Sequence, residues 1–186
     1  MGRLIFSMSV SIDGFVNDAQ GSLDWVQVDE EVHQAFNDDA RHLKASLYGA
    51  RMWDLMSSYW PTAKEDPEAT PAMLDFAAIW AQTEKIVFSS SLQSVEHGAR
   101  LVRGAAVDEV RRLKAEPGLD MDTGGPTMTA ALIEAGLVDE FTLYVVPVIL
   151  GAGTPYFPPG GPRIDLRLLE SRPFANGVTR LRYERR

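Results

Sequence analysis

The sequence contains no cysteine and only three histidines among its 186 residues. The first absence excludes disulfide bonds, thiol chemistry and zinc sites with thiolate ligands. His33, His42 and His97 are scattered along the chain, and none of them has an acidic neighbour at the spacing of a metal-ligand motif. We therefore expect no metal site.

Long apolar runs are also missing, and basic residues are few. The chain has 18 Lys and Arg against 26 Asp and Glu, a formal net charge of −8. Nucleic acids and anionic membranes do not attract so acidic a protein, so neither is an expected partner. The apolar run after Arg3 is too short for a signal peptide, and no stretch has the length of a membrane helix. We expect a cytoplasmic protein with a single domain, residues 1–186.

Strand and helix patterns alternate along most of the chain. Residues 4–10 form a continuous apolar run with two serines, which predicts a strand inside a sheet. Residues 29–44 repeat apolar side chains at helical spacing, and two alternating segments near the C-terminus flank the hairpin signal Asn176-Gly177. This order predicts an α/β fold, a three-layer α/β/α sandwich with a mostly parallel central sheet and an antiparallel C-terminal edge hairpin.

One strand pattern ends at Gly124 and Gly125, and a helical pattern begins at once with Pro126. Glycine lets a backbone approach a ligand closely, and proline suits the first position of a helix. The helix N-terminus would then offer unpaired N–H groups and a positive dipole end to a phosphate. On its own, this motif also describes a tight structural turn.

Two other junctions carry residues that suit phosphate binding. Gly49 and Arg51 follow one predicted strand, and Ser89, Ser90 and Ser91 follow another. Because the carboxyl ends of parallel strands meet at one edge of a sheet, we expect these residues to form a row with Gly124 and Gly125. Such a row predicts a dinucleotide site.

Short motifs recur in a characteristic order and spacing along nearly the whole chain: Ser11-Ile12-Asp13-Gly14, Leu23-Asp24-Trp25, Tyr48-Gly49-Ala50-Arg51-Met52-Trp53, Tyr59-Trp60-Pro61, Lys85-Ile86-Val87-Phe88-Ser89, Gly124-Gly125, Gly136-Leu137-Val138-Asp139-Glu140, Pro147-Val148-Ile149-Leu150-Gly151-Ala152-Gly153 and Phe174-Ala175-Asn176-Gly177-Val178. In these motifs the chain resembles the dihydrofolate reductase superfamily. The resemblance is to the branch that contains the C-terminal reductase domain of bacterial riboflavin biosynthesis.

The resemblance implies a dihydrofolate reductase-like fold, usually dimeric, that binds NADPH. By position, the pyrophosphate would lie at Gly124, Gly125, Pro126, Thr127 and Met128. The adenosine side would lie at Gly49, Arg51 and Met52, and the adenine ribose with its phosphate at Ser89, Ser90, Ser91 and Leu92. Ala50 and Met52 replace an arginine and a threonine that the family often has here, so the choice between NADPH and NADH stays open.

The substrate would lie on the other side of the nicotinamide, near Asp13, Trp25, Pro147 and Gly151. Asp13 is the first candidate for a catalytic group that orients the substrate or relays a proton, and the alternative is that it only caps the Asp-Gly turn. True dihydrofolate reductases have an acid near the start of the first helix. Asp29 or Glu30 is the nearest match, although both also suit an ordinary first helical turn.

The leading functional hypothesis is an NADPH-dependent reductase of a pteridine-like, pyrimidine or carbonyl small molecule, resembling 5-amino-6-(5-phosphoribosylamino)uracil reductase. Because the chain has no cysteines, we do not expect it to contain the zinc deaminase that usually accompanies that enzyme. Dihydrofolate reductase proper and a non-catalytic nucleotide-binding dimer are the alternatives. Trp53, Tyr59 and Trp60 would either wall a planar substrate or belong to the core.

Overall fold

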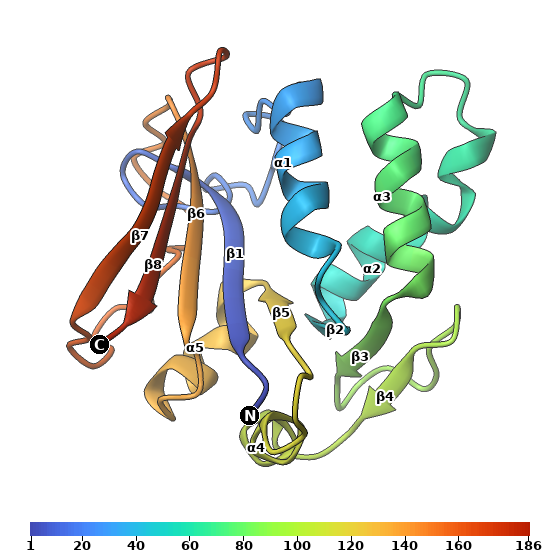
Figure 1. Ribbon diagram of the computed structural model, residues 1–186, viewed down its shortest axis with the longest axis vertical. Helices are drawn as coiled ribbons and strands as arrows, with labels where there is room; N and C mark the ends of the chain where they lie inside the picture. The colour runs from blue at the N-terminus through green and yellow to red at the C-terminus, as the bar shows by residue number, and fades with distance from the viewer.

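A computed structural model describes residues 1–186 (Figure 1). The strands are β1 (Leu4–Ser11), β2 (Ala45–Gly49), β3 (Glu84–Phe88), β4 (Arg100–Val102), β5 (Met121–Gly124), β6 (Glu140–Val146), β7 (Leu166–Pro173) and β8 (Thr179–Arg185). The helices are α1 (Glu30–Ala40), α2 (Ala50–Tyr59), α3 (Pro71–Gln82), α4 (Ala106–Lys114) and α5 (Pro126–Glu134), with a 3-10 helix η1 (Trp60–Glu65). None of the helices has the length and apolar character needed to cross a membrane.

All eight strands form one sheet in the order β4-β3-β2-β5-β1-β6-β8-β7. The six strands from β4 to β6 are parallel, and β8 and β7 continue the sheet as an antiparallel hairpin at its edge. β1 lies between β5 and β6, so the predicted position of the first strand inside the sheet is confirmed. The predicted α/β class and the antiparallel edge hairpin are confirmed as well.

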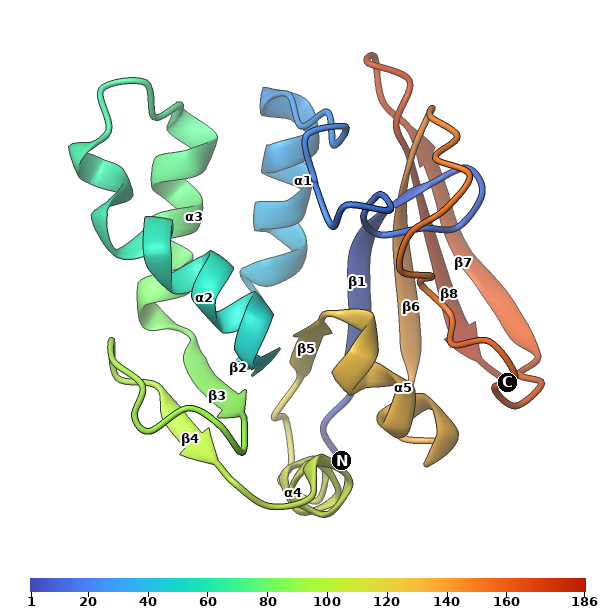
Figure 2. The same cartoon turned by 180° about the vertical axis from the view of Figure 1, so that it is seen from behind.

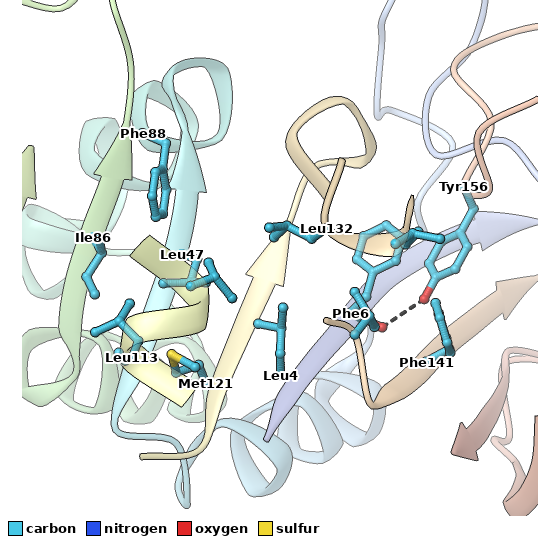
Figure 3. Close-up of a cluster of buried hydrophobic side chains, with 14 of the residues drawn as sticks. Leu4, Phe6, Leu47, Ile86, Phe88, Leu113, Met121, Leu132, Phe141 and Tyr156 are labelled. Carbon is cyan, nitrogen blue, oxygen red and sulfur yellow. Dashed lines mark hydrogen bonds between the residues drawn. The ribbon is translucent and has the colours of Figure 1, made fainter. Parts of the chain in front are cut away.

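The helices α4 and α5 cover one face of the sheet. The largest apolar cluster of the protein lies between these helices and the sheet. Leu4 and Phe6 of β1 belong to this cluster together with Leu113 of α4 and Leu132 of α5, and in Figure 3 Leu113 lies beside Met121 and Leu47. Tyr156 returns from the loop after β6, stacks on Phe6 with ring centroids 4.1 Å apart, and donates its hydroxyl hydrogen to the Phe6 carbonyl at 2.8 Å. This face is closed by continuous packing.

The opposite face carries two smaller clusters instead of one. Val32 and Ala35 of α1 pack over Tyr144 of β6, with the C-terminal hairpin beside them. Trp53 of α2 and Trp80 of α3 pack over β2 and β3. Neither cluster includes a residue of β1 or β5, the two strands between them. The centre of this face is therefore left without close apolar packing.

The helices α1 and α3 run side by side above this central gap (Figures 1 and 2). The buried amide of Asn37 joins them, because its Nδ2 donates to the Ala72 carbonyl at 2.8 Å and to Asp75 at 2.9 Å. Arg180 of β8 ties α1 to the hairpin through Asp39 at 3.0 Å and Glu170 at 2.8 Å. These contacts hold the two helices over the sheet at a fixed height.

Two helix boundaries differ from the sequence prediction. The helix predicted over residues 29–44 ends at Ala40, since the following residues turn and the Lys44 amide donates to the Asp120 carbonyl beside the sheet. A second difference is that residues 60–65 form the 3-10 helix η1, which the sequence pattern did not predict. Pro61 occupies its first turn and Ala63 is buried beneath it, which explains why this polar segment is ordered as a helix.

Candidate active site

The three junctions predicted to form a row lie next to one another at the carboxyl edge of the parallel sheet. In the register of the strands, Gly49 of β2 pairs with Phe88, the last residue of β3, and Tyr48 pairs with Gly124 of β5. The serines after β3, the glycine before α2 and the glycines before α5 are therefore neighbours. The helices that follow β2 and β5 pack on opposite faces of the sheet, so a crevice opens between them.

The helices α2 and α5 both begin with a glycine at the N-cap, where no side chain bonds to the first N–H groups. In contrast, Asp29 and Thr70 cap α1 and α3 with their side chains. Gly125 has φ of +91°, which disfavours any residue with a side chain. The open first turns fit the phosphates of a dinucleotide, because unpaired N–H groups and the helix dipole favour an anion there.

Arg51, in the first turn of α2, is exposed and forms no hydrogen bond or ion pair. It lines a polar cavity of about 500 Å³ with residues 17–21, Gly153 and Thr154. A guanidinium without a partner beside an uncapped helix end is a suitable donor for a phosphate. Arg51 thus lies beside Gly49 at the sheet edge, and its role in dinucleotide binding stays a prediction.

The serines after β3 have different local roles. The Ser89 hydroxyl accepts hydrogen bonds from the Ser91 amide at 3.2 Å and the Leu92 amide at 3.1 Å, so it shapes the turn. Leu92 packs against the Trp53 and Trp80 cluster, whereas Ser90 and Ser91 are exposed at the edge. The Ser91 hydroxyl lies 3.3 Å from the Ser89 hydroxyl, so Ser90 is the serine of this turn whose hydroxyl has no partner within the protein.

A cavity of about 650 Å³ lies in the central gap between the sheet and the helices α1, α2 and α3. Its floor is largely polar and comes from neighbouring strands: Ser7 and Ser9 of β1, Ser46 and Tyr48 of β2, Asp122 and Gly124 of β5, and Thr142 of β6. Its roof is largely apolar: Phe36, Met52, Met56, Trp60, Phe76 and Trp80. A polar floor under an aromatic roof suits a flat ring with polar edges.

The Gly124 backbone connects this cavity to the carboxyl edge of the sheet. Gly124 lines the cavity, and the next residue, Gly125, begins α5. A Cβ atom at Gly124 would lie 3.2 Å from Met52 Cε, so glycine lets α2 approach the strand here. The Gly125 amide donates to Met8 Sδ at 3.3 Å, which fixes the orientation of the turn.

Asp122 is the exceptional residue of the cavity. It is paired across the sheet with Ser46 on one side and Ile5 on the other, and its Oδ1 atom is buried without a hydrogen-bond partner. Burial raises the pKa of Asp122 from 3.8 to about 6, and the neighbouring Ser46 hydroxyl offsets part of that effect. A carboxyl group of this kind holds its proton closer to neutral pH than an exposed aspartate does.

The sequence profile of the RibD C-terminal domain matches residues 3–180. This chain belongs to the RibD C-terminal domain family. The uncharacterized protein YyaP of Bacillus subtilis is 32% identical over 182 residues, which are 97% of this chain and 94% of that protein.

Solved structures share the fold of this RibD C-terminal domain. A putative riboflavin biosynthesis protein from Shewanella matches with a TM-score of 0.77 and 21% identity over 100% of this chain and 99% of that chain. A Thermotoga maritima diaminohydroxyphosphoribosylaminopyrimidine deaminase/5-amino-6-(5-phosphoribosylamino)uracil reductase matches with a TM-score of 0.68 and 14% identity. This match covers 100% of our chain and 57% of the Thermotoga maritima chain. At such identities the likeness establishes the fold.

Asp13, the predicted catalytic residue of this RibD C-terminal domain, lies outside the main cavity. Its two carboxylate oxygens accept the amide hydrogens of Leu150 at 3.1 Å and Gly151 at 2.7 Å. The Ser11 side chain, followed by these two amides, holds the pKa of Asp13 below its usual value. This geometry favours a clamp on the loop after β6 over a proton donor.

The other predicted substrate residues also lie outside the main cavity. Trp25 packs against the α1 cluster and donates from Nε1 to the Ser22 carbonyl at 3.2 Å. Pro147 and Gly151 are exposed on the loop that Asp13 clamps. Among the aromatic candidates, Trp60 lines the cavity roof, Trp53 is buried in the core, and Tyr59 donates its hydroxyl hydrogen to Asp66.

The acids considered for a dihydrofolate reductase mechanism are used as helix caps. Asp29 accepts the Val32 amide at the start of α1, and Glu30 accepts the Ala72 amide at the start of α3. Neither residue lines the main cavity. The cavity acid that sequence analysis missed is Asp122. The only feature of the sequence that could have indicated Asp122 is its position in the strand, two residues before the glycine pair and between residues that are buried.

Replacing Asp122 with asparagine is expected to change how stability depends on pH. The folded protein holds the Asp122 proton more tightly than the unfolded chain does, so this residue lowers stability as pH rises from about 4 through 6. The stability of Asp122→Asn relative to wild type should therefore increase by about 2–3 kcal/mol between pH 4 and pH 8. Urea unfolding at several pH values measures this difference.

The matched control is Asp54→Asn, which removes an exposed carboxylate from α2. It should leave the pH dependence unchanged within about 0.5 kcal/mol. If the two variants show the same pH dependence of stability, the Asp122 carboxyl is hydrated and its pKa is that of an exposed aspartate.

Proposed function

We propose that this chain is an NADPH-dependent reductase of a small pteridine-like, pyrimidine or carbonyl substrate, resembling 5-amino-6-(5-phosphoribosylamino)uracil reductase. The observation that carries the proposal is the continuity of β5 and α5. Gly124 lines the cavity for a flat ring, and Gly125 begins the helix that suits a phosphate. A ring in the cavity and a dinucleotide along the edge would meet at these two residues.

The residues of the chain have distinct roles in this proposal. NADPH, when bound, supplies the hydride. The amides at the start of α5 and α2 would hold the phosphates, and Arg51 would bind a phosphate on the adenosine side. The cavity roof and floor would hold the substrate ring in one orientation and exclude water. Asp122 would donate a proton to the substrate atom next to the carbon that receives the hydride.

Replacing Arg51 with glutamine is expected to weaken NADPH binding about tenfold and NADH binding less than about twofold, because the guanidinium would bind the phosphate that only NADPH carries. Calorimetric titration of both nucleotides measures these affinities. The control is Arg111→Gln, an exposed arginine on α4 that is paired with Asp108. Failure of wild type to bind either nucleotide at millimolar concentration would refute the cofactor assignment.

Oxidation of NADPH by a panel of pterins, pyrimidines and carbonyl compounds tests catalysis itself. For any substrate that is turned over, Asp122→Asn should lower kcat by about 10²-fold to 10⁴-fold while NADPH affinity stays within about twofold. Asp13→Asn should retain more activity than Asp122→Asn. Turnover of none of the panel would favour the non-catalytic nucleotide-binding alternative, and equal losses in the two variants would reject Asp122 as the proton donor.

We further propose that the protein forms a homodimer through the outer strand of the hairpin. β7 lies at the edge of the sheet, and its Leu168 and Leu169 are 52% and 39% exposed. An exposed strand edge with leucines is unfavourable in water and favours pairing. Leu168→Lys should shift the protein from dimer to monomer in sedimentation velocity, whereas Leu74→Lys on α3 should not. A monomeric wild type would exclude this dimer.

A further inference from the structure

The main cavity holds an excess of carboxylates, and every arginine in its wall is already paired. Arg3 contacts Asp120 at 3.1 Å and Glu140 at 3.6 Å. Arg182 contacts Glu140 at 2.7 Å and Glu170 at 3.6 Å. No guanidinium in the cavity wall is therefore left to bind an anionic group of a substrate.

His33 and Tyr48, two further titratable groups of the cavity wall, do not supply a positive charge either. His33 on α1 is half-buried beneath Trp60 and Phe76, and burial lowers its pKa, which favours the neutral ring. Tyr48 on β2 is neutral, because burial and the nearby Asp122 raise its pKa. His42, in the segment after α1, is exposed and also lines the cavity.

Asp122 has no cationic partner, and the Ser46 hydroxyl is its polar neighbour across the sheet. Asp39 binds Tyr144 and Arg180, Asp38 accepts from Gln34, and Asp120 and Glu140 pair with the two arginines. The buried Oδ1 of Asp122 therefore lacks the donor that a buried polar atom ordinarily has. A ligand with N–H donors or a positive charge would supply it.

We propose that Asp122 selects flat rings that carry a positive charge or paired N–H donors, and that the cavity rejects rings bearing a phosphate or carboxylate. The aromatic roof supports the same choice. Trp60 and Phe76 pack edge to face with centroids 4.5 Å apart above the floor, and aromatic faces attract cations. The inference rests on the proposed reductase function where it concerns the substrate. It distinguishes this chain from a reductase whose pyrimidine substrate carries a ribosyl phosphate.

For a reducible ring, the inference fixes the position of one proton. With NADPH bound to supply a hydride to the carbon of a C=N bond, the Asp122 carboxyl would give its proton to the nitrogen. The products are the reduced C–N bond, the oxidised nicotinamide and the Asp122 carboxylate, which regains a proton from water. The proton can lie on either partner of the complex. The ring is then neutral and Asp122 protonated, or the ring is protonated and Asp122 is a carboxylate.

Three probes of equal size test the selection without any cofactor: benzamidine, benzamide and benzoate, measured by quenching of tryptophan fluorescence at pH 7.5. Benzamidine should bind at least about tenfold more tightly than benzamide, and benzoate should not bind. Asp122→Asn should reduce the preference for benzamidine to about twofold or less. Asp38→Asn removes another carboxylate of the cavity wall and should preserve the preference.

The pH dependence and a phosphate comparison complete the test. Benzamidine affinity should fall as pH drops below about 6, because protonation of Asp122 removes its charge. Uridine should bind at least about tenfold more tightly than uridine 5′-monophosphate. Equal binding of benzamidine and benzamide, or tighter binding of the monophosphate, would overturn the proposal. Because these measurements need no NADPH, they fail independently of the reductase assignment.

Discussion

The structure depends on a difference between the two faces of one sheet. Toward α4 and α5, the central strands present Leu4, Phe6 and Met121, which pack into a continuous core. Toward α1, α2 and α3, the same strands present small or polar side chains such as Ser7, Asp122 and Gly124, and the apolar packing divides into two clusters on either side. Because the helices are anchored at those two clusters and to each other, they span the middle without filling it. The cavity follows from this division.

The strand β5 gives the cavity its chemistry. Its side chains alternate between faces, so Met121 and Thr123 are fully buried while Asp122 and Gly124 line the cavity. The strand ends at Gly124, and the next residue, Gly125, has a positive φ and is the N-cap of α5. Within four residues the chain thus provides an acid, a close backbone approach and a helix N-terminus without a side-chain cap. An unpaired buried carboxyl lowers stability, and function is the usual reason for such a group to be present.

Local rules and sheet topology made much of this predictable from sequence. Gly125 and Pro126 were recognised because glycine lets a backbone approach a ligand and proline suits the first position of a helix. The three junctions were placed together because parallel strands share an edge. The cavity was not predictable, because it arises where helices fail to pack, a property of tertiary structure. Asp13 shows the same limit, since its partners Leu150 and Gly151 lie more than 130 residues away in the chain. From sequence alone, a loop clamp and a catalytic acid look alike.

The central claim is that the turn at Gly124 and Gly125 joins a dinucleotide edge to a substrate cavity governed by Asp122. A crystal structure of the protein with NADPH tests it most directly. The account predicts the pyrophosphate against the first turn of α5 and the nicotinamide ring at Gly124, with one face open to the cavity and to the Asp122 carboxyl. A nicotinamide that points away from this cavity, or a dinucleotide bound away from Gly125, would contradict it.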